Sequence, residues 1–214
     1  MKGVPDVVVV GAGPCGSAAA LNLAKHGANV TVFEEHGQIG APSHCPGHLS
    51  INGLKQLGLL PLPAGIIENA FCGATFYSQK ANAFSLRFSS PVTCTVDRVL
   101  FDQHIAELAK ASGATYELES RVESLLIKEG FVKGVIINRK GRKEEVSAGI
   151  IVDAEGISSR LLRQLGLRPL DPHNLVKGAQ AEVENARNLE SGMVEVFLGS
   201  EYAPGFYAWV IPKG

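Results

Sequence analysis

The sequence predicts an α/β fold in which a parallel sheet carries an inserted antiparallel sheet. Three observations support this prediction. A strand, a glycine turn, a helix and a second strand follow one another in residues 7–33, and short segments alternate between apolar and polar residues in 70–96. Hydrophobic residues make up 45% and charged residues 19% of the 214 residues, which is typical of a globular chain and excludes a disordered one.

The first elements form a βαβ unit. Residues 7–10 are a run of valines, typical of a strand that is buried on both faces. Small and helix-favouring residues then continue from Pro14 to a stop at Gly27, and a second strand follows over residues 29–33. Such a unit normally builds a parallel sheet.

The next stretch indicates irregular structure followed by an inserted sheet. Residues 36–63 are rich in glycine, proline and histidine, with one short helical pattern near 51–57. This composition is typical of a loop that carries functional residues. Residues 74–77 and 84–88 alternate and predict antiparallel strands.

A second helix returns the chain to the first sheet. Asp97 is placed to cap a helix that runs through Ser112 and stops at Gly113. Strands joined by glycine turns, a short helix and further strands of the inserted sheet complete the prediction. The strands cover residues 121–127, 131–138 and 145–152, the helix covers 159–165, and the further strands cover 181–183 and 193–197.

Charge and cysteine content narrow the class of protein. The formal net charge of −1 offers no broad positive field, so we expect no nucleic-acid partner. The uncharged run over residues 7–24 contains glycines and a proline, which argues against a membrane helix. No CxxC pair occurs, and we expect reduced thiols in a cytoplasmic protein at Cys15, Cys45, Cys72 and Cys94.

A glycine motif lies between the first strand and the first helix. In this context a GxGxxG turn places a pyrophosphate on the helix N-terminus, so we predict cofactor contacts by Gly11, Gly13, Pro14, Cys15 and Gly16. The first glycine makes the turn, the second lets a phosphate approach the backbone, and the third lets helix and strand pack.

A carboxylate ends the second strand. Glu34 is placed to accept hydrogen bonds from a ribose diol and would repel a 2′-phosphate, which favours FAD or NAD over NADP. Glu35 is the rival contact, but it should point to the other face of the strand.

Two further motifs favour FAD. The segment from Asp153 through Gly156 to Arg160 resembles the DxxGxxSxxR signature of the para-hydroxybenzoate hydroxylase superfamily of flavoproteins, with Glu155 in place of the commoner Asp. The segment around Arg98 resembles that superfamily's helix start, where an arginine reaches the flavin. The resemblance implies that Arg98, Asp153, Gly156 and Arg160 contact FAD.

Two further segments resemble one particular family of flavoproteins. GAPSHCPGHLSINGL at residues 40–54 and PGFYAWVIPKG at 204–214 resemble the cysteine loop and the YxWxxP segment of the geranylgeranyl reductase family. Those enzymes are FAD-dependent and saturate isoprenoid double bonds. The resemblance implies that the loop of Cys45, the expected catalytic residue, lies by the isoalloxazine, and that Tyr207 and Trp209 border a prenyl pocket.

The same resemblance implies partners and a domain plan. The substrate would be a prenyl lipid, electrons would come from NAD(P)H or a ferredoxin, and peripheral membrane contact to collect the substrate stays open. We expect a Rossmann-like FAD-binding domain from residues 1–69 and 97–165, with an incomplete, inserted antiparallel-sheet substrate domain from residues 70–96 and 166–214.

The sequence departs from the family pattern in two places. Its cysteine loop reads Cys-Pro-Gly-His where many relatives carry an acidic residue, and the chain stops at Gly214, before the segment that closes over the flavin phosphates in the superfamily. We therefore expect the N-terminal part of a longer unit, or a chain that has lost this clamp. Such a chain would bind FAD weakly and reduce no prenyl lipid at an appreciable rate.

Three other functions stay open. A flavin monooxygenase and an electron-transfer-flavoprotein:quinone-type dehydrogenase share the nucleotide motifs, and a noncatalytic flavin-binding protein would share them too.

His44, Cys45 and His48 could be imagined as zinc ligands, but no fourth ligand is evident and their spacing matches no common structural site. No metal is predicted.

Overall fold

The computed structural model describes residues 3–80, 82–168 and 171–213. They divide into two compact units: unit 1 contains the residues up to 43 and residues 99–174, and unit 2 contains residues 44–98 and those from 175 onward. These bounds differ from the expected domains: residues 44–69 and 97–98 fall in unit 2, and the segment 166–174 falls in unit 1. Residues 44–69 do so because two of their strands pair with a strand near residue 95.

Unit 1 is built on a parallel sheet, which confirms the predicted βαβ unit. Its strand order is β12-β1-β2-β8, and Val7 of β1 stands opposite Ile150 of β12 and Val30 of β2. The bounds of its strands are Val7–Val10 (β1), Val30–Phe33 (β2), Thr115–Glu117 (β8) and Ile150–Asp153 (β12).

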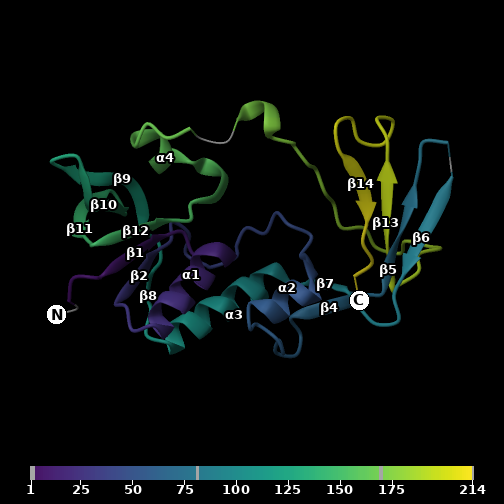
Figure 1. The fold of residues 1–214 in the computed structure, drawn as a ribbon, viewed down its shortest axis with the longest axis horizontal. Helices are drawn as coiled ribbons and strands as arrows, with labels where there is room; N and C mark the ends of the chain where they lie inside the picture. Colours follow the sequence, from purple (N-terminus) through teal and green to yellow (C-terminus); the bar gives the residue numbers. More distant parts are fainter. Residues whose placement is uncertain (1–2, 81, 169–170, 214) are drawn as a thin grey trace. The chain divides into compact units, whose positions relative to one another are not determined.

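The valine run of β1 is buried on both faces, as predicted. Helix α1, Pro14–Lys25, packs on β1 and β2 (Figure 1). Val8 and Val10 belong to a core cluster with Val135 and Ile137 of β10 and Leu161 of α4. The sheet that carries the glycine motif is therefore fixed by apolar packing from both sides.

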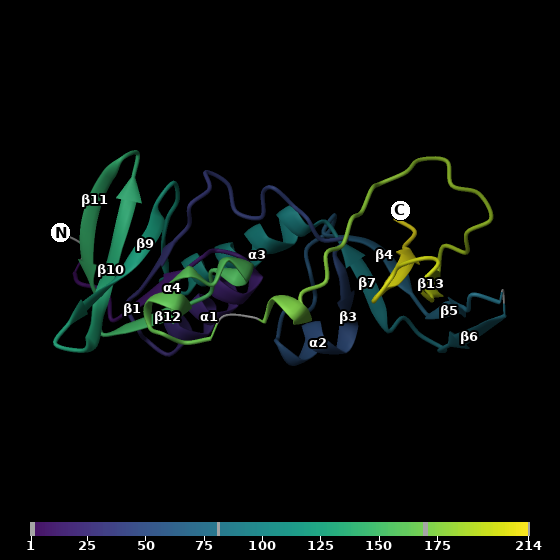
Figure 2. The ribbon, with the colours of Figure 1, turned by 90° about the horizontal axis from the view of Figure 1, so that it is seen from above.

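A three-stranded antiparallel sheet accompanies the parallel one. It has the order β11-β10-β9, formed by Arg121–Lys128 (β9), Phe131–Arg139 (β10) and Arg142–Ser147 (β11), and Figure 2 shows these strands side by side. The prediction of one strand over residues 145–152 was wrong. The chain leaves β11 at Ala148 and Gly149, whose N–H groups bond Lys133 and Asp6, and then enters the parallel sheet as β12.

Unit 2 contains two sheets where the sequence predicted one. The first has the order β3-β7-β4 and is antiparallel, and the second has the order β14-β13-β5-β6. The pairing of β5 with β6 is antiparallel as predicted, whereas β13 pairs with β5 in parallel. The strands are His48–Ser50 (β3), Ile67–Phe71 (β4), Gly73–Tyr77 (β5), Ala83–Arg87 (β6), Thr93–Val96 (β7), Met193–Leu198 (β13) and Tyr207–Val210 (β14).

The predicted helices are confirmed, whereas a second predicted strand, over residues 181–183, was wrong. Residues 181–183 form no strand, because Ala181 and Val183 are exposed and this short alternation has no apolar face to bury. The helices are Ile51–Gln56 (α2), Arg98–Ala111 (α3) and Arg160–Gln164 (α4), with short 3-10 helices at Gly156–Ser158 (η1) and Pro172–Asn174 (η2). Every helix in the described ranges is too short or too polar to cross a lipid bilayer.

Candidate functional site

The glycine turn between β1 and α1 is tightly packed at two of its three glycines. Gly11 has φ +97°, and a Cβ atom there would lie 2.6 Å from the carbonyl oxygen of Ala154. A Cβ atom at Gly16 would lie 1.9 Å from the carbonyl oxygen of Gly11. Both positions therefore require glycine, the first for backbone conformation and the second for close packing of helix and strand.

The middle glycine faces open space. A Cβ atom at Gly13 would meet no atom within 4 Å, and Gly13 is also the N-cap of α1, with no side chain bonded to the helix end. Pro14 occupies the first helical turn, and Cys15 beside it is exposed. The helix N-terminus thus offers N–H groups and positive dipole charge at a place where a phosphate can approach.

The structure brings Glu34, and not Glu35, to this turn. The side chain of Glu34 is only 12% exposed, and its Oε2 accepts a hydrogen bond of 2.8 Å from the N–H of Ala12. Its Oε1 accepts a bond of 2.9 Å from the N–H of His36 and lies 2.6 Å from His36 Nδ1. Glu35 is exposed and pairs with Arg121 instead, at 3.2 Å from its Nε.

The segment after β12 adjoins the same turn. Asp153 stands opposite Val10, and the N–H of Ala154 donates to the carbonyl oxygen of Val10. Asp153 Oδ1 accepts a bond of 3.1 Å from the N–H of Glu155. Desolvation raises the pKa of the Asp153 carboxyl group, and this bond opposes the rise. The parallel sheet therefore brings Gly11, Glu34 and Asp153 to one edge, at the carboxyl ends of its strands.

Glu155 has a structural task that the sequence reasoning missed. Its side chain is 5% exposed, its Oε1 accepts a bond of 2.8 Å from the N–H of Leu161, and its Oε2 lies 3.5 Å from Arg160 Nε. The Glu155 side chain thereby caps the N-terminus of α4 from a position six residues before Leu161. Gly156, which follows Glu155, has φ +67°. Arg98, the remaining predicted contact, is the first residue of α3 and is half-buried.

Unit 2 contains an apolar cavity of about 670 Å³. Its volume lies within the roughly 300–1,000 Å³ of small-molecule sites. The wall is one face of the β14-β13-β5-β6 sheet, because the strand register aligns Phe76 with Val196 and Val196 with Trp209. The side chains of these strands that line it include Ala74, Phe76, Leu86, Val194, Val196 and Leu198.

Both aromatic residues predicted to border a substrate pocket line this cavity. The ring centroids of Tyr207 and Trp209 lie 5.9 Å apart, in an edge-on arrangement. Pro46 also lines the cavity, and its neighbour Cys45 is exposed. Unit 2 therefore brings the cysteine loop to the same cavity as the YxWxxP segment.

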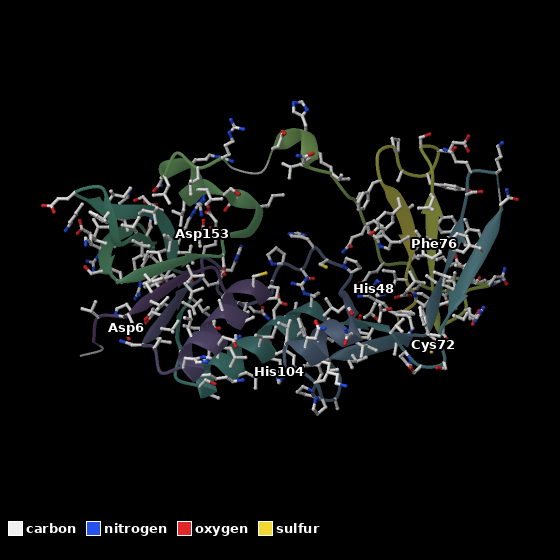
Figure 3. All side chains as sticks on the ribbon, in the orientation of Figure 1. Asp6, His48, Cys72, Phe76, His104 and Asp153 are labelled. Carbon is white, nitrogen blue, oxygen red and sulfur yellow. The ribbon has the colours of Figure 1, made fainter. Side chains whose placement is uncertain are left out.

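A polar pair interrupts the apolar wall. His48 Nε2 lies 2.8 Å from Thr93 Oγ1, and the imidazole packs edge-on against Phe71 at a centroid distance of 5.5 Å. Burial lowers the pKa of His48. His48 and Phe76, two of the lining residues, are both labelled in Figure 3. Within the described ranges, His44, Cys45 and His48 belong to no group of side chains arranged to hold a metal ion.

Comparison with known proteins identifies the cofactor. Residues 5–212 match the family described as the FAD binding domain. The chain belongs to the FAD-binding domain family. Its cofactor is therefore FAD, which decides between the two dinucleotides that the glycine turn and Glu34 left open. The open space at Gly13 and the uncapped N-terminus of α1 fit the pyrophosphate of this cofactor.

Relatives of this FAD-binding chain are named as reductases. It is 35% identical over 98% of its length to digeranylgeranylglycerophospholipid reductase 2 of Methanopyrus kandleri, and 32% identical over 100% to digeranylgeranylglycerophospholipid reductase of Methanosarcina acetivorans. It covers 52% and 53% of these proteins, so the chain spans about half the length of the curated relatives it matches. These relatives confirm the resemblance to the geranylgeranyl reductase family.

A solved structure shows the same fold. The crystal structure of a geranylgeranyl bacteriochlorophyll reductase-like protein from Thermoplasma acidophilum superposes with a TM-score of 0.84 at 28% sequence identity. The match covers 98% of this chain and 54% of that chain. The α/β architecture predicted from the sequence is thereby confirmed.

Proposed function

We propose that this chain acts as a FAD-dependent oxidoreductase that saturates carbon–carbon double bonds of a geranylgeranyl or other polyprenyl lipid. The observation that carries the proposal is the apolar cavity with Tyr207 and Trp209 in its wall, in a FAD-binding chain whose relatives are named digeranylgeranylglycerophospholipid reductases. A large cavity without a charged lining residue among those described suits a hydrocarbon chain.

The residues of unit 1 would hold the cofactor. In this proposal the N-terminus of α1 and the open backbone at Gly13 bind the pyrophosphate, and the Glu34 carboxylate accepts hydrogen bonds from the adenosine ribose. The further contacts that the superfamily motifs imply are Asp153, Gly156 and Arg160 of unit 1, and Arg98, the last residue of the 44–98 segment of unit 2. Bound FAD, when reduced, supplies the hydride that alkene reduction requires.

The residues of unit 2 would hold the substrate and the proton. The lining side chains would orient the prenyl chain and exclude water from it, since the wall consists mainly of aliphatic and aromatic groups. Cys45, exposed and adjacent to the lining residue Pro46, would give the proton that the second alkene carbon receives. The family resemblance supplies the remaining partners, which are NAD(P)H or a ferredoxin as electron donor and a membrane surface as lipid source.

An anaerobic single-turnover experiment tests the proposal. The FAD-loaded chain is reduced with dithionite, freed of excess reductant and mixed with a geranylgeranyl lipid, so that even a slow reaction is detected. We expect reoxidation of the flavin and a product that has gained two hydrogen atoms, seen by mass spectrometry. A requirement for oxygen would instead indicate a monooxygenase. Reoxidation by a quinone alone would indicate a dehydrogenase, and a flavin that no acceptor reoxidises would indicate a noncatalytic protein.

A further inference from the structure

Few of the described residues that line the unit 2 cavity are polar. None of the described residues that line it carries a fixed charge. Tyr207 is 41% exposed, so that part of its ring faces solvent. His48 and Thr93, by contrast, are bonded to each other on two neighbouring strands, β3 and β7, and both line the cavity.

The His48 ring is held in place from two sides. Its Nε2 is fixed by Thr93 Oγ1 at 2.8 Å, and the edge-on contact with Phe71 fixes the plane of the ring. Within the part of the chain that the structure describes, Nδ1 of His48 has no hydrogen-bond partner, and it is not among the fully enclosed unpartnered atoms. Nδ1 is therefore an accessible polar atom of a residue that lines the cavity.

The protonation state decides what this atom can do. Burial lowers the pKa of His48, so the imidazole is neutral near pH 7 and is a poor source of a proton. A neutral imidazole bonded through Nε2 offers Nδ1 as one donor or one acceptor, depending on which way the Thr93 hydroxyl points. A hydroxyl group of a ligand can match either arrangement, and an ether oxygen can match the donor arrangement.

We propose that the His48–Thr93 pair is the polar anchor of this cavity and hydrogen-bonds one uncharged oxygen, a hydroxyl or an ether, of an otherwise apolar prenyl ligand. The inference rests on the proposed function and adds a specificity-determining residue pair to it. An anionic end group such as a diphosphate is disfavoured at this point, because the described lining offers no cation to offset its desolvation.

The single tryptophan of the sequence provides the measurement. Trp209 lines the cavity, so its fluorescence reports occupancy whether or not any double bond is reduced. The FAD-loaded chain is titrated at constant FAD with geranylgeraniol, its methyl ether, the matching hydrocarbon without oxygen, and geranylgeranyl diphosphate. We expect the alcohol to bind roughly fivefold to tenfold more tightly than the hydrocarbon, the effect of one neutral hydrogen bond.

Two variants and a matched control locate the effect. His48→Phe keeps a planar ring against Phe71, and Thr93→Val keeps the strand shape, so each should bring the alcohol-to-hydrocarbon affinity ratio close to one without weakening hydrocarbon binding. Thr75→Val is the control. It removes a hydroxyl from β5 that bonds Ser85 and does not line the cavity, and it should leave the ratio unchanged.

The outcomes separate this inference from the proposed function. Four results would each overturn the proposed anchor role of His48 and Thr93. They are equal binding of alcohol and hydrocarbon by the wild type, tighter binding of the diphosphate, no response to any ligand, and an unchanged affinity ratio in Thr93→Val. If the ratio is present and depends on Thr93, but the single-turnover experiment yields no saturated product, the anchor stands and the proposed reductase function fails. Methyl ether binding as tight as that of the alcohol would show that Nδ1 donates.

Discussion

At the scale of single residues, Glu34 shows how a short strand end can prepare a ligand site. Its carboxylate is held between the N–H groups of Ala12 and His36. These bonds orient the acceptor oxygens at the glycine turn and remove most of the side-chain freedom that binding would otherwise cost. The sequence alone placed Glu34 correctly at the end of β2, because strand alternation separates it from Glu35.

Replacing Glu34 should weaken the cofactor site. We expect Glu34→Ala to lower FAD affinity tenfold or more, because charge-assisted hydrogen bonds of about 1.5–3 kcal/mol each are lost. Equilibrium dialysis of FAD against the purified chain measures the change. Glu35→Ala is the matched control, since Glu35 pairs with Arg121 on the surface, and it should leave the affinity unchanged. Equal FAD binding by Glu34→Ala and the wild type would contradict the assignment.

Cys45 allows a test of the proposed proton donor. Its thiol is exposed, and its neighbour Pro46 lines the cavity. Cys45→Ser should retain FAD and slow single-turnover alkene reduction by at least tenfold, because a hydroxyl is a much weaker acid than a thiol. Full activity of Cys45→Ser, measured by product formation, would reduce this thiol to a packing role.

At the scale of elements, local sequence patterns predicted which segments become strands better than which strands pair. The valine run of β1 and the alternation in β5 and β6 were sufficient to identify those strands. The break at Ala148 and Gly149 was missed because residues on both sides of it are strand-forming, and only pairing with β10 and β1 separates them. His48 and Thr93 are 45 residues apart, so no local pattern could have joined them.

Strand β7 carries two threonines on the same face with opposite expected effects on stability. Thr95 is fully buried, and its hydroxyl has no hydrogen-bond partner among the described residues. Thr95→Val should therefore raise the free energy of unfolding by about 1 kcal/mol, since it removes an unsatisfied buried hydroxyl from a strand that favours β-branched residues. Thr93→Val should lower the free energy of unfolding by a similar amount, because it breaks the bond to His48.

Urea unfolding of both variants, followed by circular dichroism, checks this prediction. The two substitutions are chemically identical and lie two residues apart, so general effects of valine on β7 cancel in the comparison. Loss of stability in both variants would show that the Thr95 hydroxyl is satisfied in solution.

At the scale of the whole molecule, stability should depend on pH through His48. Burial lowers the pKa of His48 in the folded chain below its ordinary value of 6.5. As pH falls through 6.5, the unfolded chain takes up this proton first, so stability decreases until the folded-state pKa has been passed. His48→Phe lacks this contribution and should lose less stability between about pH 7 and about pH 5.

The pH series is measured by urea unfolding of wild type and variant in the same buffers. Subtracting the two curves removes the titration of all other groups, provided that they behave alike in both proteins. A difference curve that stays flat across this range would mean that His48 has the same pKa in the folded and unfolded chains.

The chain order of unit 2 has a consequence for biosynthesis. Strand β5 pairs with β13, yet the whole second half of unit 1 is translated between Tyr77 and Met193. During that interval the apolar side chains of β5 and β6 have no sheet partner on the β13 side, so the nascent chain exposes the future ligand wall to water and to other chains. Ribosome-bound chains arrested before Met193 should therefore bind a hydrophobic dye more strongly than chains released after Val210. The apolar wall that would bind a ligand in the folded protein is therefore a surface that a chaperone could protect during translation.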